Sequence, residues 1–223
     1  MMKKILEIAC FDFLSAEIAL SSLADRIELC QDRQNGGLTP SLEEFKYLRG
    51  KYSKPIYVMI RPSAGTFLYT DLELELMQRD LLSFKQAGAD GFVFGILTPH
   101  NDIDAAHCAK LLDLAAGLPC TFHRAVDQTS DLEKSIEQLV SLGFQGVLTS
   151  GGKPTALEGA QTLAQLVHKY SEKIEIIVGG NVRSENIVEL QNTTGAGSYH
   201  SSAILDYESF ASGEEIKRLH MLL

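Results

Sequence analysis

The residues of this chain that could do chemistry stand directly behind short apolar segments, and residues 120–127 show this most clearly. They read Cys-Thr-Phe-His-Arg-Ala-Val-Asp, so an imidazole, a guanidinium and a carboxylate follow a few strand-forming residues. Histidine titrates near neutral pH, and arginine binds anions through a planar set of donors. We therefore expect a functional site where this segment ends, with His123 at its centre.

Alternation of side chains along the extended segments indicates which other ionisable groups share an interior with His123. Because a charge pressed under apolar helices lacks partners, we let the charged side chains point inward. The last segment is ambiguous, and there we place His200 inward. Carboxylates near a histidine favour acid–base work, which makes the candidate catalytic residues Glu7, Glu28, Arg61 and His123. The alternative is that these four groups only neutralise one another.

Glycine and serine pairs follow the last three strand-like segments. Glycine lets backbone N–H groups approach a ligand closely, and such amides form a local anion site even in an acidic protein. The candidate anion-binding residues are therefore Arg61, Gly151, Gly179, Gly180, Ser201 and Ser202, with Arg124 and Arg183 as further charge partners. The alternative is that the glycine pairs only form tight turns.

Two sulfur-containing side chains are also expected inside, near His123. Thiolate, thioether and imidazole groups suit Cu(I), so the candidate metal ligands are Cys30, Met59 and His123. Single cysteines and methionines are more often ordinary core residues, which is the alternative here. Cys10 and Cys120 are expected to face the helices.

The elements that must position these residues alternate strictly between strand and helix. Strands are expected at residues 5–9, 26–30, 55–60, 91–95, 120–123, 147–149, 175–178 and 198–200. Eight such units predict an α/β fold, a (β/α)8 TIM-type barrel, as a single domain over residues 1–223 with a short C-terminal helix. An open doubly wound sheet is the alternative, weakened because no Gly-x-Gly-x-x-Gly sequence follows a strand. In a barrel, function belongs at the C-terminal ends of the strands.

Composition limits the class of protein. The net charge of −9 argues against a nucleic-acid partner, because phosphate backbones are bound by clustered lysine and arginine. No apolar run approaches the roughly 20 residues needed to span a bilayer, and residues 1–7 reach a glutamate too soon for a signal peptide. We therefore expect a cytoplasmic protein without a membrane partner. Its four cysteines are far apart, which favours free thiols.

Several motifs together resemble the CutC family, in the right order from about residue 7 to residue 203. They are Ala-Asp-Arg-Ile-Glu-Leu-Cys (24–30), Gly-Gly-Leu-Thr-Pro-Ser (36–41), Val-Met-Ile-Arg-Pro (58–62), Gly-Ala-Asp-Gly-Phe-Val-Phe-Gly (88–95), Thr-Phe-His-Arg-Ala (121–125), Leu-Thr-Ser-Gly-Gly (148–152), Thr-Ala-Leu-Glu-Gly (155–159) and His-Ser-Ser (200–202). The resemblance implies a cytoplasmic TIM-type barrel, a homodimer or larger homo-oligomer, associated with copper homeostasis and Cu(I) binding. It makes Cys30 the best copper candidate. Residues 7–10 depart from the family's Glu-Val-Cys pattern, because the cysteine sits one place later.

Two functions follow from these patterns. The first is a copper-handling protein that binds Cu(I) through Cys30 with help from Met59 or His123. The second is a TIM-barrel enzyme that acts on a small phosphorylated or anionic metabolite by acid–base chemistry. The partner of the protein is accordingly expected to be a copper ion in the first case and a small anionic metabolite in the second.

Overall fold

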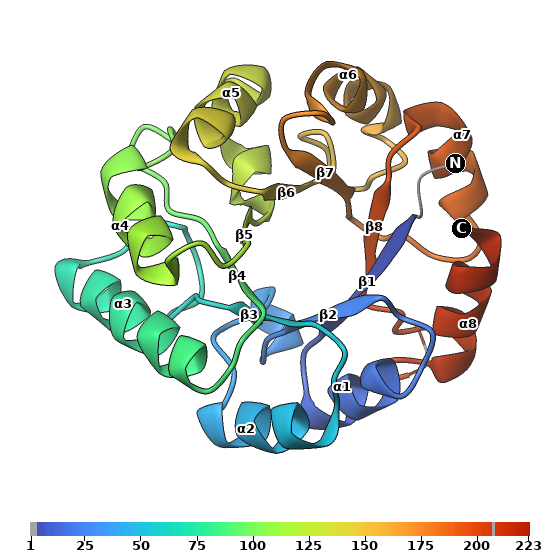
Figure 1. The fold of residues 1–223 in the computed structure, drawn as a ribbon. Coiled ribbons are helices and arrows are strands. Elements are labelled where there is room, and N and C mark those ends of the chain that lie inside the picture. The colour runs from blue at the N-terminus through green and yellow to red at the C-terminus, as the bar shows by residue number, and fades with distance from the viewer. Residues whose placement is uncertain (1–3, 207) are drawn as a thin grey trace.

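Eight parallel strands close into a barrel in chain order, β1 to β8, and helices surround it (Figure 1). The computed structural model describes residues 4–206 and 208–223. The strands are β1 Ile5–Cys10, β2 Arg26–Leu29, β3 Ile56–Met59, β4 Gly91–Phe94, β5 Cys120–Phe122, β6 Gly146–Thr149, β7 Glu175–Val178 and β8 Ser198–Ser201. The predicted (β/α)8 TIM-type barrel is confirmed.

The outer layer consists of one helix after each strand, and two short 3-10 turns complete the loops. The helices are α1 Phe13–Leu20, α2 Leu42–Lys51, α3 Asp71–Gln86, α4 Ala105–Ala115, α5 Leu132–Leu142, α6 Ala160–Tyr170, α7 Ile187–Thr194 and the short C-terminal α8 Gly213–Leu222. The 3-10 turns are η1 Arg33–Asn35 and η2 Arg124–Gln128. No helix in the described ranges has the length and apolar character that crossing a membrane requires.

Local capping explains where most helices begin, with one departure from expectation. A capping box begins α3, with the Thr70 and Glu73 side chains each bonded to the other's backbone N–H. Thr155 and Glu158 have the spacing of a helix-capping pair in the sequence, and they do bond each other. However, α6 begins later, after Gly159, where an added Cβ would lie 1.8 Å from the Ser150 carbonyl oxygen. This close approach ties the segment before α6 to the end of β6.

Side-chain alternation sorts the strand residues into two layers, as predicted. Cys10 and Cys120 are buried in the core between the strands and the helices. Cys30 and Met59 belong instead to a separate interior cluster with Val93. The inner layer therefore carries the groups that reach the C-terminal ends of the strands.

Candidate functional site

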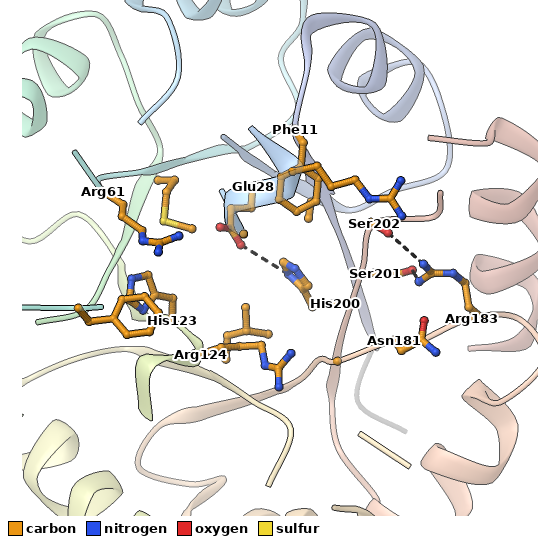
Figure 2. Close-up of a pocket in the computed structure, with 17 residues that line it drawn as sticks. Phe11, Glu28, Arg61, His123, Arg124, Asn181, Arg183, His200, Ser201 and Ser202 are labelled. Atoms are coloured by element: carbon orange, nitrogen blue, oxygen red, sulfur yellow. Dashed lines mark hydrogen bonds and ion pairs between the residues drawn. The ribbon is translucent and has the colours of Figure 1, made fainter. Parts of the chain in front are cut away.

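A cavity of about 290 Å³ opens where the strands end, and ten of its lining residues are labelled in Figure 2. Residues from or directly behind seven of the eight strands line it, which is the usual construction of a site on this fold. Its polar and charged lining consists of Glu28, Arg33, Arg61, His123, Arg124, Asn181, Arg183, His200, Ser201 and Ser202.

Glu7 anchors a buried ion cluster beneath this cavity. The strand register sets Glu7 beside Arg26 on β2 and beside His200 on β8. Its Oε2 lies 2.5 Å from Arg26 Nε, and its Oε1 lies 2.7 Å from His200 Nδ1. Burial alone would raise the pKa of Glu7, but Arg26 and His200 hold it at about 2. The pKa of His200 is raised overall. Burial by itself would lower this pKa, but the carboxylates of Glu7 and Glu28 favour the protonated imidazole.

Glu28 is the carboxyl group that this cluster presents to the cavity. It is 3% exposed, and its Oε2 has no hydrogen-bond partner among the described residues. The nearest positive group is His200, whose Nδ1 lies 3.6 Å from that oxygen. Burial, together with the charge of Glu7, raises the pKa of Glu28 to about 7 despite His200 and Arg26. Glu28 can therefore gain or lose a proton near neutral pH, as a general acid or base must.

Arg61 is held by backbone carbonyl groups rather than by a carboxylate. Its Nη1 donates to the Asn35 and Gly37 carbonyls at 2.6 and 2.9 Å, and its Nη2 donates to Gly65 at 3.1 Å. Its buried Nε has no partner in the described part of the chain. Arg61 thus brings an uncompensated positive charge to the cavity wall, where its guanidinium lies 4.8 Å from the Phe67 ring centroid.

His123 shares this wall, and it is 4% exposed. Its Nδ1 accepts a hydrogen bond from the Ala125 backbone N–H at 3.3 Å, while its Nε2 has no partner in residues 4–206 and 208–223. Its ring lies 4.8 Å from that of Phe67. Burial first, and then the charge of Arg61, lower the pKa of His123 to about 3, so the imidazole is neutral at physiological pH.

The opposite side of the cavity carries Arg183 and two serines (Figure 2). Arg183 donates from Nη1 to Ser201 Oγ at 3.3 Å and from Nη2 to Ser202 Oγ at 3.2 Å. Gly180 and Asn181, from the loop after β7, complete this side, and both have positive φ values, 111° and 60°. Such backbone is uncommon for asparagine and is often found at functional sites.

Arg124 borders the cavity and also organises the neighbouring loop. Its Nε lies 3.0 Å from Asp127 Oδ2, and its Nη2 donates to Ser150 Oγ at 2.7 Å. The other Asp127 oxygen accepts the Gly152 N–H at 2.9 Å. The two residues therefore join η2 to the loop after β6.

The predicted anion-binding glycines take different positions. Gly180 lines the cavity, whereas Gly151 and Gly179 do not. The N–H of Gly151 donates to Thr149 Oγ1 at 2.9 Å, and that of Gly179 donates to the Thr149 carbonyl at 3.0 Å. At Gly179 an added Cβ would lie 2.5 Å from Leu148 Cδ1, so this glycine makes room for an interior side chain. The contacts give Gly151 and Gly179 a structural task.

The predicted copper ligands are only partly assembled. Cys30 and Met59 pack together, but Cys30 is 2% exposed and its thiol donates to the Cys10 carbonyl at 3.3 Å. Burial, with the charge of Glu28, raises the pKa of Cys30 well above its ordinary value. Among the described residues, one group of three potential ligands drawn from histidine, cysteine, aspartate and glutamate has its ligand atoms within 4.8 Å of one another, and it consists of Glu7, Glu28 and His200. There Arg26 already neutralises Glu7.

Sequence reasoning missed Arg26, which occupies the first position of the strand that also carries Glu28. Alternation places residues 26 and 28 on the same face, so this signal was available. Arg183 was predicted only as a possible charge partner, although it is the guanidinium bonded to both serines. The aromatic residue over Arg61 and His123, Phe67, lies in a loop and gave no signal.

Comparison with known proteins supplies the family. The model of the CutC family matches residues 4–205. Family protein CutC of Pasteurella multocida is 43% identical over 194 residues, which cover 86% of this chain and 80% of that protein. The copper homeostasis protein cutC homologs of Caenorhabditis elegans and Homo sapiens are 40% and 41% identical, covering 89% and 81% of this chain and 80% and 66% of their own lengths.

Solved structures agree with this family. A crystal structure of a CutC protein from Streptococcus agalactiae superposes with a TM-score of 0.84 at 35% identity, covering 89% of this chain and 98% of that one. Phosphoribosyl anthranilate isomerase from Thermococcus kodakaraensis reaches 0.64 at 15% identity, covering 98% of each chain, and shares the fold alone. From the family match and the curated relatives together, this chain belongs to the CutC family, whose members are named for copper homeostasis.

Proposed function

We propose that this protein is an enzyme that acts on a small, phosphorylated or otherwise anionic metabolite by acid–base chemistry. One observation carries the proposal: within the described residues, four arginines and a single carboxylate line the cavity, although the chain has a net charge of −9. The arginines are Arg33, Arg61, Arg124 and Arg183. A positive cavity in an acidic protein favours an anionic ligand, because it concentrates positive potential where the ligand binds.

The cavity divides the expected tasks between its two sides. Arg183 offers its positive charge to a phosphate group, and the Ser202 hydroxyl, which only accepts hydrogen bonds from the described residues, offers a donor. Both Nη groups of Arg183 and the Ser201 hydroxyl already donate within the protein, to the Val182 and Ile204 carbonyls and to the serine oxygens. Glu28 is the proposed base, because its unpartnered oxygen faces the cavity from a buried position. His200, held by Glu7, keeps a positive charge beside it and stabilises the carboxylate form. A cytoplasmic location and a homo-oligomeric state remain predictions of the sequence.

Replacing Arg183 by glutamine is expected to weaken binding of inorganic phosphate and of glycerol 3-phosphate about 10- to 100-fold, the loss that removing a charge-assisted hydrogen bond implies. Isothermal titration calorimetry measures both affinities, and circular dichroism checks the fold. Arg218→Gln is the matched control, since Arg218 is an exposed residue of α8 paired with Glu214. Equal affinities in wild type and Arg183→Gln would remove Arg183 from the site, and no binding by wild type would overturn the proposal.

Copper binding is the second candidate, with Cu(I) as cargo. It is favoured by the packing of Cys30 against Met59 and by the names of the relatives. His123 fits this site poorly: a metal on Nε2 requires the proton on Nδ1, where the Ala125 N–H already points. The sulfur pair alone would hold the ion, and the Cys30 thiol would have to release its proton and its bond to Cys10.

An anaerobic titration against a strong Cu(I) chelator tests this second candidate. The wild type is expected to take up one Cu(I) per chain, and Cys30→Ser is expected to lose it, because the thiolate is the strongest soft ligand available. Cys120→Ser is the matched control, since this buried thiol faces the helices. If Cys30→Ser competes for Cu(I) as well as the wild type and Cys120→Ser do, Cys30 is not the ligand.

A further inference from the structure

We infer that His123 is a hydrogen-bond donor to a carbonyl oxygen of the substrate, and that the metabolite is an anionic carbonyl compound whose neighbouring C–H proton is moved. This inference rests on the proposed function and names its substrate class and reaction class. It gives His123 a role different from both roles that the sequence suggested, because His123 is then neither the base nor a metal ligand.

The hydrogen bonding of the imidazole determines which nitrogen carries the proton. The Ala125 backbone N–H points at Nδ1 from 3.3 Å, and a backbone N–H can only donate. Nδ1 is therefore the accepting, unprotonated nitrogen. In a neutral ring the proton must then reside on Nε2, so His123 offers an N–H donor.

This donor has been left without an acceptor inside the protein. Nε2 is buried and unpartnered among the described residues, while the residue lines the cavity. A buried donor without a partner costs free energy unless a ligand satisfies it. The neighbouring Arg61 guanidinium offers only donors, and Phe67 offers only a ring face. A ligand oxygen is the natural acceptor.

The packing around the ring fixes its orientation. At Gly95 an added Cβ would lie 2.6 Å from both Cε1 and Nδ1 of His123, so the ring fits against a bare backbone. Phe67 packs on it at 4.8 Å and Phe122 at 5.9 Å between ring centroids. A donor held this firmly is preorganised, which is how a site stabilises negative charge that develops on an oxygen.

The arrangement across the cavity specifies the ligand. Figure 2 shows His123 and Arg61 on one side, Arg183 with Ser202 on the other, and Glu28 with His200 between them. A phosphate at Arg183 would direct the rest of the molecule past Glu28 toward His123. The group that reaches His123 must carry an acceptor oxygen that gains charge during the reaction, and a carbonyl next to an acidic C–H has this property.

The chemical step balances without a co-reactant. The Glu28 carboxylate takes a proton from the carbon beside the carbonyl, and the C–H electron pair forms a C=C bond. The carbonyl π pair moves to oxygen, where the Nε2–H of His123 and the charge of Arg61 stabilise it. Where that carbon bears a hydroxyl, the hydroxyl proton moves to the former carbonyl oxygen and Glu28 returns its proton to the adjacent carbon, which completes an isomerisation. A neutral imidazole suits the donor role, because a cationic one would instead lose its proton to the oxygen.

Two ligands with the same phosphate and similar length test the inference. One is 2-phosphoglycolohydroxamate, which mimics an enediolate, and the other is glycerol 3-phosphate, which has no carbonyl. Calorimetry in buffer with a chelator present is expected to show that the wild type binds the hydroxamate about tenfold or more tightly. His123→Phe, which keeps a ring but loses the donor, is expected to bind the two ligands within about twofold of each other. His123→Gln, which restores an N–H donor, should recover part of the preference.

The outcomes separate the inference from the proposed function. If the wild type binds both ligands equally, the carbonyl assignment is overturned and the anion site remains. The same conclusion follows if His123→Phe still binds the hydroxamate more tightly than glycerol 3-phosphate. Arg183→Gln should weaken the binding of both ligands while keeping the ratio of their affinities. If the wild type binds neither, the proposed function fails and the inference with it. Should His123→Phe not fold, ¹⁵N-edited spectra of the wild type decide: an Nε2–H tautomer from pH 5 to 8 is expected, and an Nδ1–H tautomer overturns the inference.

Discussion

Replacing Glu28 by glutamine is expected to lower turnover about 10²- to 10⁴-fold, the contribution typical of a general base, with little change in phosphate affinity. Glutamine has the shape of the carboxyl group but cannot accept a proton. Because burial raises the pKa of Glu28 to about 7, wild-type kcat/KM should rise with pH through that value as the carboxylate forms. Residual Glu28→Gln activity should lack this rise. Glu75→Gln, an exposed change on α3, is the control.

The same substitution is expected to stabilise the protein at alkaline pH. In the folded state the pKa of Glu28 is raised above the ordinary 4.5, so the folded protein binds the proton more tightly than the unfolded chain does. Stability from this group is therefore present below pH 4.5 and is lost as the pH rises through 7. Glutamine mimics the protonated form and removes that loss, which is worth about 3 kcal/mol at pH 8 for a shift of this size.

Urea unfolding at pH 8 and pH 5 measures this gain, and most of it should disappear at the lower pH. A group retained although it destabilises the fold is what a catalytic position is expected to show. If Glu28→Gln were less stable than the wild type at pH 8, the carboxylate would be satisfied by its neighbours. Glu28 would then be a structural ion pair, and its assignment as base would be wrong.

The sequence predicted the barrel well, because strand alternation and turn residues are local signals that eight repeats reinforce. It also identified most of the side chains that face the cavity, since Glu28, Arg61 and His123 follow from alternation alone. It could not predict their partners. Arg61 meets three carbonyl groups rather than a carboxylate, and this depends on how the loops after β2 and β3 fold over one another.

The glycine-rich loops show the same limit. The sequence identifies a backbone that can approach a ligand closely, but not which of its amides remain free. The Gly151 N–H donates to the Thr149 hydroxyl two residues earlier. The Gly179 N–H donates to the Thr149 carbonyl, a contact that only the register of β6 and β7 reveals. The tautomer of His123 depends likewise on one backbone N–H, which the tight turn of η2 directs at its Nδ1.

Arg26→Met is expected to cost about 3–5 kcal/mol of stability at pH 7, the usual price of stranding one member of a buried ion pair. Glu7 is 1% exposed and would keep only His200 as its partner. Arg26 also contacts Glu175 at 3.1 Å and lies 4.9 Å from the Tyr57 ring centroid, so methionine preserves the packing while it removes the charge. Urea unfolding measures the loss, and Arg218→Met, at an exposed ion pair, should stay within about 0.5 kcal/mol.

The pH dependence identifies Glu7 as the cause of this loss. Its folded pKa of about 2 lies below the ordinary 4.5, so its contribution to stability is present above pH 4.5 and is lost as the pH falls toward 2. Without Arg26, burial dominates and raises the pKa of Glu7, so the carboxyl is neutral near pH 4. The deficit of Arg26→Met should therefore be smaller at pH 4 than at pH 7.

A second substitution separates the charge of Glu7 from the packing of Arg26. The double variant Arg26→Met with Glu7→Gln removes both members of the pair and should recover most of the lost stability, because no charge is left stranded. If the double variant were no more stable than Arg26→Met, the loss would arise from packing against Tyr57 or from Glu175. Recovery would instead show that the main task of Arg26 is to neutralise the buried Glu7 carboxylate.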